Sequence, residues 1–129
     1  KGKSKDVLCE IIQKIDKEKY SAVKINKFID KVKSSDTIVS VCMTKDESNR
    51  VPEWEEIAAV SMAVQNMWLS CYVNDIGSYW STPTLKDDYA KHSGLNSNQK
   101  SLGFFFMGSY KHLETPKVRE GLDSKVEWV

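Results

Sequence analysis

The sequence predicts an α+β protein. Two amphipathic helical patterns open the chain, and two short β-branched or aromatic runs stand further along it, separated by helical segments. The predicted order is helix, helix, strand, helix, helix, strand and a short tail. No glycine-rich phosphate loop joins a strand to a helix, which argues against a doubly wound nucleotide-binding sheet. A chain of 129 residues suffices for one domain with a modest core, so we treat residues 1–129 as a single domain.

The first fifty residues predict two helices and a strand. Ser4 to about Tyr20 carries apolar residues at helical spacing, and Lys24 to Lys33 does so over a shorter length. The run Thr37 to Met43, TIVSVCM, is β-branched and short, which is typical of a buried strand. The expected inward positions are Val7, Leu8, Ile11, Ile12 and Ile15 in the first helix, and Ile25, Phe28, Ile29 and Val32 in the second.

The central segment predicts a long buried helix from Glu53 to Asn74. Pro52 suits its first turn, and three glutamates nearby suit the positive end of its dipole. Residues 57–74 hold no charge, a length that could cross a membrane. A polar stripe at helical spacing argues against that and favours a protein core or a subunit interface instead. The stripe consists of Ser61, Gln65, Asn66 and Ser70.

The remaining elements are shorter. Leu85 to His92 predicts a helix that stops at Gly94. The run Ser101 to Ser109, SLGFFFMGS, predicts a second strand, and the alternation in Lys125 to Val129, KVEWV, predicts an edge strand.

Charge and cysteine content exclude some function classes. The formal net charge is +1, which gives no electrostatic case for binding nucleic acid or an anionic membrane. The basic residues gather in the first fifty positions, a pattern typical of a solvated lysine-rich helix face. Cys9, Cys42 and Cys71 are widely spaced in apolar settings, without a second cysteine or a histidine nearby. Such buried thiols predict a reduced, cytoplasmic protein.

A search for catalytic side chains returns no convincing group. His92 and His112 lie in polar segments where surface histidines are expected. Glu53, Glu55 and Glu56 form a carboxylate cluster that a helix N-terminus explains without catalysis. There is no metal-ligand spacing. The protein is therefore either not an enzyme, or one in which a cofactor carries the chemistry.

The central stretch resembles a known family. VPEWEEIAAVSMAVQNMWLSCYVNDIGSYWSTP is similar to the central helix and following loop of the FMN-dependent nitroreductases. In that family an acidic start leads into an alanine-rich helix containing Gln-Asn, and then into a Gly-Ser-x-Trp turn. TIVSVCM resembles the central strand of the family, LGFFFMG a late strand, and TPKVREGLDSKVEWV the basic loop and closing strand.

The resemblance implies an FMN-dependent NAD(P)H oxidoreductase with a sheet flanked by helices. It implies a homodimer formed through the 53–74 helix and the C-terminal tail, with FMN as cofactor and NADH or NADPH as electron donor. The acceptor would be a nitro compound, a quinone or a similar small molecule. No catalytic side chain is implied. The implied cofactor-binding residues are Gly77, Ser78, Tyr79, Trp80, Ser81 and Thr82 around the ring, with Lys117 and Arg119 at the phosphate.

One departure from the family pattern and one alternative interpretation of the residues leave other functions open. The Arg-Ser-x-Arg segment with which family members begin is not among these residues, so we expect a partial domain. The residues alone also allow Gly77 to Trp80 to be a helix C-cap with a core tryptophan. The alternative function is therefore a flavin-free helical interaction or dimerisation module on the same scaffold, or an inactive fragment.

Overall fold

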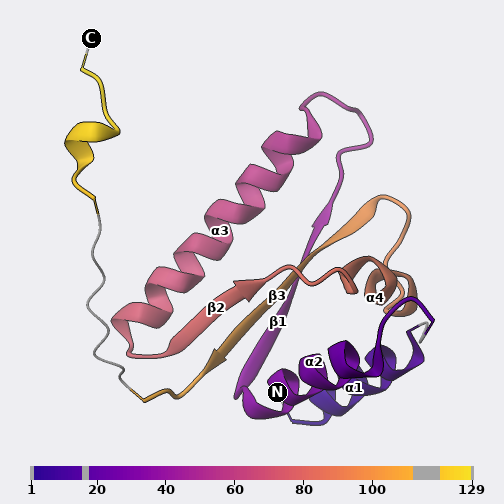
Figure 1. The fold of residues 1–129 in the computed structure, drawn as a ribbon. Helices are drawn as coiled ribbons and strands as arrows, with labels where there is room; N and C mark the ends of the chain where they lie inside the picture. Colours follow the sequence, from indigo (N-terminus) through magenta and orange to yellow (C-terminus); the bar gives the residue numbers. More distant parts are fainter. Residues whose placement is uncertain (1, 16–17, 112–119, 129) are drawn as a thin grey trace.

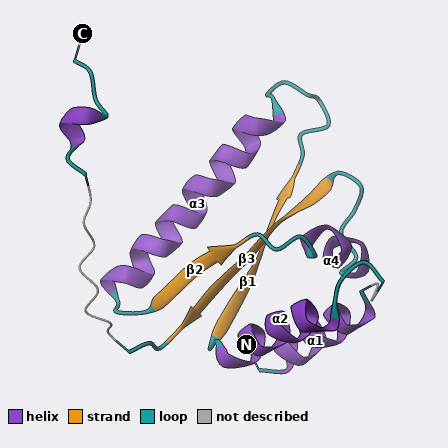
Figure 2. Ribbon diagram, in the orientation of Figure 1, coloured by secondary structure: helices purple, strands orange, loops and turns teal. Residues whose placement is uncertain are grey.

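A three-stranded antiparallel sheet organises the protein (Figures 1 and 2). In this computed structural model, residues 2–15, 18–111 and 120–128 are described. The central strand is β3 (Gln99–Gly108), flanked by β1 (Thr37–Thr44) and β2 (Gly77–Ser81), so the strand order is β1-β3-β2. β1 and β2 are both edge strands. The predicted α+β class is confirmed.

Three helices cover one face of the sheet. These are α1 (Lys3–Lys14), α2 (Ala22–Ser34) and α4 (Lys86–His92), and Figure 1 shows them on the side opposite the long helix. The four residues predicted to point inward from the second helix are all buried, and they pack against Phe104 and Phe106 of β3. The side chain of Ser21 accepts a hydrogen bond from the backbone N–H of Lys24 and so caps α2.

One long helix, α3 (Glu53–Val73), covers the other face. Val64 and Cys71 of α3 pack with Phe105 of β3 in a second core. Three consecutive phenylalanines can all be buried because successive strand residues point to opposite faces, and here both faces are covered.

α3 is less buried than its composition predicts. Its bounds agree with the prediction to within one residue, but only Val64 and Cys71 are fully buried. The outward side exposes large apolar groups, including Tyr72 at 79% and Val73 at 81%. The prediction of a helix buried within the chain is therefore wrong. In the described part of the chain, no helix is long and apolar enough to cross a membrane.

Three other predicted elements differ in the structure. α1 ends at Lys14 because Ile15 turns to an extended conformation, from which its side chain enters the core. The expected turn at residues 77–80 is the strand β2, since β3 offers it a pairing edge. The tail holds a short 3-10 helix, η1 (Leu122–Ser124), and residues 125–128 form no strand, so that prediction is wrong for the part of the tail that is described.

Candidate functional site

β2 carries five of the predicted cofactor-binding residues, Gly77 to Ser81, and its residues help to line two cavities. Its side chains alternate, so Tyr79 and Ser81 share one face while Ser78 and Trp80 share the other. Tyr79 stacks on Phe106 with ring centroids 5.1 Å apart, on the side of α1 and α2. Trp80 packs on the α3 side, among the residues of the second core.

Trp80 anchors the strand. Its indole Nε1 donates a hydrogen bond of 3.0 Å to the carbonyl oxygen of Leu102, and its ring packs against the second core. Trp80 lines neither of the two cavities described below. The indole therefore holds β2 against β3 and does not form a cavity wall.

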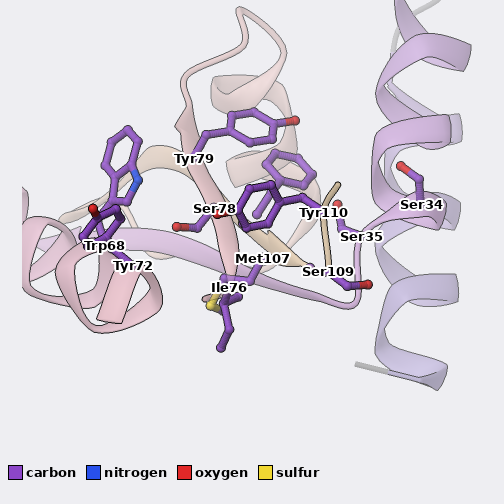
Figure 3. A pocket seen from close by; sticks show the side chains of 13 residues that line it. Ser34, Ser35, Trp68, Tyr72, Ile76, Ser78, Tyr79, Met107, Ser109 and Tyr110 are labelled. Atoms are coloured by element: carbon purple, nitrogen blue, oxygen red, sulfur yellow. The ribbon is translucent and has the colours of Figure 1, made fainter. Parts of the chain in front are cut away.

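The larger cavity, of about 610 Å³, lies where β2 begins and β3 ends (Figure 3). Trp68 and Tyr72 of α3 lie on one side of it in this view, and Ser34 and Ser35 at the end of α2 lie on the other. Its lining combines hydroxyl groups, aromatic rings and glycine backbone, and none of the described residues that line it is charged. The predicted residues in its wall are Gly77, Ser78 and Tyr79.

Two glycines lie side by side in this wall. Gly77 pairs with Gly108 across β2 and β3. A Cβ at Gly77 would lie 2.8 Å from the ring of Tyr110, so this ring packs directly on the glycine. The hydroxyl of Tyr110 donates to a carboxylate oxygen of Asp75 at 3.2 Å. Burial first, and this hydrogen bond second, raise the pKa of Tyr110 above its ordinary value.

Tyr79 lies between this cavity and a lysine of α2. The Nζ atom of Lys31 lies 5.8 Å from the centroid of the Tyr79 ring, within the range of a cation–π contact. Burial raises the pKa of the Tyr79 hydroxyl, so the group stays protonated near neutral pH. Tyr79 is thus a neutral ring with a cation beside it.

A smaller cavity of about 200 Å³ lies between α2 and the connection from β2 to α4. We call it the lysine cavity, because Lys24, Lys27 and Lys31 line it together with Ser81 and Thr84. Sequence reasoning assigned the early lysines to a solvated face. The spacing of these three at i, i+3 and i+7 places them on one side of a helix, and that signal could have singled them out.

Thr82 follows β2 and lies over a glycine bulge. Gly103 has φ +107, and a Cβ there would lie 2.3 Å from the carbonyl oxygen of Ser81 and 3.1 Å from the Cα of Thr82. The pairing of β1 with β3 shifts register at this point, which marks a β-bulge. Gly103 therefore sets the path of the chain at the end of β2.

The comparisons with known proteins agree with this fold. Residues 5–109 match the nitroreductase family. The chain belongs to the nitroreductase family. A crystal structure of a nitroreductase-like family protein from Bacillus cereus superposes with a TM-score of 0.84 at 21% sequence identity, covering 99% of this chain and 69% of that one. A comparison with curated proteins finds no match.

Family membership confirms the resemblance drawn from the sequence. The quoted segments form β1, α3 with β2, and β3, in the predicted order, and the nitroreductase-like fold is confirmed. The two residues predicted to bind the FMN phosphate, Lys117 and Arg119, lie outside the described residues, as does His112. His92 is exposed, and its Nδ1 lies 2.8 Å from the backbone oxygen of Asp88.

The carboxylate of Asp88 stabilises the fold through several hydrogen bonds. Asp88 is 8% exposed and accepts hydrogen bonds from Lys19 at 2.6 Å and from the Tyr20 hydroxyl at 2.7 Å. Lys91 adds an ion pair of 3.1 Å. These donors, Lys19 first, hold the pKa of Asp88 well below its ordinary value. The cluster ties the α1–α2 connection to α4. Among the described residues, no group of three or more could hold a metal ion.

Proposed function

We propose that this protein is an FMN-dependent NAD(P)H oxidoreductase of the nitroreductase type. Membership of the nitroreductase family over residues 5–109 carries the proposal. FMN, when bound, supplies hydride transfer from a reduced pyridine nucleotide to an acceptor. The protein then has to bind and orient flat rings, which requires bare backbone, aromatic faces and a few polar groups rather than a reactive side chain.

The larger cavity fits a flat ring. Its volume of about 610 Å³ lies inside the range of about 300–1,000 Å³ typical of small-molecule sites. The ring of Tyr110 lies against Gly77 where a Cβ would collide with it, so an aromatic plane can reach the backbone there. Gly77 and Gly108, which pair across the two strands, themselves add no side chain to this wall.

The polar groups of this cavity suit a neutral ring system. The hydroxyls of Ser78, Ser109, Ser34 and Ser35 can donate to ring carbonyls and accept from a ring N–H. We assign Gly77, Ser78 and Tyr79 to ring contact.

Residues near the end of β2 take other roles. We assign Ser81, the last residue of β2, and Thr82, which follows it, to the continuation of the ring site, and Trp80 to holding β2 in place. A phosphate dianion requires cations, and the described lining of the larger cavity offers none. We assign the phosphate to Lys117 and Arg119.

A second copy of the chain would complete the site. The outward side of α3 exposes apolar groups along an uncharged stretch, and leaving them in water costs about 25 cal/mol for each Å². Tyr72 belongs both to this exposed side and to the lining of the larger cavity, so a partner seated on α3 would reach the mouth of the cavity. We therefore propose a homodimer through α3, aided by the C-terminal tail.

The electron donor is NADH or NADPH, and the acceptor is a nitro compound, a quinone or a similar small molecule. All three cysteines are unpaired, which fits a reducing compartment, so we propose a cytoplasmic location.

Flavin retention tests the proposal. Protein passed through gel filtration with FMN should show the flavin absorption bands at a ratio near one per chain, and should oxidise NADH or NADPH when a nitroarene or quinone is added. Relative to wild type, Gly77→Val should reduce the amount of bound flavin by a larger fraction than it reduces the free energy of unfolding measured in urea. An equal loss of both would assign Gly77 to folding alone. Wild-type protein that stays colourless would refute the flavin function and favour a flavin-free interaction module built on α3.

A further inference from the structure

The side chain of Tyr110 lies where the proposed flavin ring would contact Gly77. The Cδ1, Cβ and Cγ atoms of Tyr110 are 2.8, 3.0 and 3.0 Å from the position that a Cβ on Gly77 would take. Figure 3 shows the Tyr110 ring in the centre of the residues that line the larger cavity. Because two sets of atoms cannot share one volume, a ligand ring and the Tyr110 ring cannot both pack on this side of Gly77.

The Tyr110 ring is held in this place by weak contacts. Its hydroxyl donates to Oδ1 of Asp75 at 3.2 Å, and this bond joins the chain after β3 to the turn between α3 and β2. Asp75 is exposed, and the Tyr110 side chain is itself 48% exposed. Water can therefore replace the bond at little cost, and a side chain this exposed changes rotamer within nanoseconds.

The backbone beside Tyr110 is fixed independently of the ring. The backbone N–H of Ser109 donates to Oδ2 of Asp36 at 2.9 Å, and the backbone N–H of Asp36 donates to the carbonyl oxygen of Met107 at 2.9 Å. These bonds join the end of β3 to the start of β1. The Tyr110 ring can thus leave Gly77 by rotation about its side-chain bonds, while β3 stays paired.

We propose that Tyr110 competes with the flavin ring for Gly77. The proposal rests on the proposed function, which assigns Gly77 to ring contact. In the empty site the phenol ring covers the glycine and its hydroxyl donates to Asp75. When the flavin ring binds, the phenol ring turns outward. Such an internal competitor lowers the apparent affinity in proportion to the fraction of molecules in which the glycine is uncovered.

The test is a titration of the full chain with riboflavin, followed by flavin fluorescence. Tyr110→Ala should bind riboflavin about threefold to tenfold more tightly than wild type, the factor that corresponds to the net contribution of one ordinary hydrogen bond. Tyr110→Phe keeps the ring and loses the bond to Asp75, so its affinity should lie between the two. Ile76→Ala is the matched control, because Ile76 is exposed and lines the same cavity without covering Gly77.

Each outcome of the titration has a distinct meaning. Weaker binding by Tyr110→Ala would overturn the proposal, make Tyr110 a wall of the ring site and keep the flavin function. Equal affinities of wild type and Tyr110→Ala, or the same gain in Ile76→Ala, would also overturn it. If riboflavin binds neither wild type nor any variant, the flavin function and the competition are refuted together.

A second measurement follows the Tyr110 ring directly. The protein is labelled with 3-fluorotyrosine, and the fluorine resonance of Tyr110 is identified by its absence from Tyr110→Phe. Riboflavin should move this resonance toward that of free 3-fluorotyrosine, because the ring leaves Gly77 for water. A resonance that stays in place while riboflavin binds, or that moves away from the free value, would contradict the displacement.

Discussion

Removing the charge of Asp88 should destabilise the protein in a pH-dependent way. Asp88 is 8% exposed, and its Oδ2 accepts from the buried Tyr20 hydroxyl at 2.7 Å and from Lys19 at 2.6 Å. Asp88→Asn keeps an acceptor oxygen but loses the negative charge. In wild type, Tyr20 donates to a charged acceptor, and such a hydrogen bond is worth about 1.5–3 kcal/mol. In Asp88→Asn the acceptor is neutral, and the bond is worth about 1 kcal/mol. Lys19 and Lys91 reach solvent and add little. We expect a loss of about 0.5–2 kcal/mol at pH 7.

The sign of the pH dependence follows from the direction of the pKa shift. The donors around Asp88 depress its pKa in the folded state, whereas in the unfolded chain it is about 3.9. Its contribution to stability is therefore fully present above pH 4, and it declines as the pH falls toward the depressed folded-state pKa. The difference between wild type and Asp88→Asn should be constant from pH 7 to pH 5 and smaller at pH 3.

Urea unfolding at pH 7, 5 and 3 measures this difference. Asp87→Asn is the matched control, because Asp87 is adjacent, largely exposed and paired only with Lys86 among the described residues. Its free energy of unfolding should change by less than about 0.5 kcal/mol at every pH. If the difference in free energy of unfolding between wild type and Asp88→Asn is the same at pH 7 and pH 3, the electrostatic explanation is refuted. A gap no larger than that of Asp87→Asn would refute the role of the cluster altogether.

Three further predictions concern the bulge, the phosphate and the dimer. Gly103→Ala should cost about 3 kcal/mol or more in urea unfolding, because its φ of +107 is strained for alanine and the new Cβ would lie 2.3 Å from a carbonyl oxygen of β2; Gly121→Ala, where a Cβ meets nothing within 4 Å, should change little. Arg119→Ala should weaken FMN binding by about 1.5–3 kcal/mol and leave riboflavin binding unchanged, with Lys125→Ala as the control. Equal FMN affinities of wild type and Arg119→Ala would show that Arg119 does not bind the phosphate. Leu69→Glu, at a site 52% exposed in the single chain, should convert the dimer to a folded monomer in sedimentation, whereas a folded wild-type monomer at micromolar concentration would refute the dimer.

Local signals predicted α2 and the start of α3 well, but not the end of α1, nor the burial of Val7, which is exposed. Pro52 and the acidic first turn marked the start of α3, and the actual helix begins at the predicted Glu53. The apolar positions of α2 predicted its buried face in full. These predictions succeeded because helix ends and helix faces depend on residues within one or two turns of each other.

Predictions that depended on distant partners were poorer. Glycine, serine and tryptophan at residues 77–80 indicate a turn, and only pairing with β3 makes this segment a strand. An uncharged helix indicates burial, but the sequence does not say whether its own chain or another covers it. The convergence of the α2 lysines on Ser81 likewise depends on the β2–α4 connection, 50 or more residues away from them in the sequence. In each of these cases the structure depends on contacts between residues distant in the sequence, which the local sequence pattern does not specify.

The side chains of β2 point alternately to the two faces of the sheet. This explains how one short strand can both pack into the core and line two cavities. Trp80 points into the second core and fixes the strand through its bond to Leu102. On the opposite face, Tyr79 and Ser81 are then held in place while they line different cavities. Among the described residues, β2 pairs with β3 alone, so its other edge is unpaired in that part of the chain. A site on such a strand is positioned by the core without being buried in it, which is the combination that binding a large flat ligand requires.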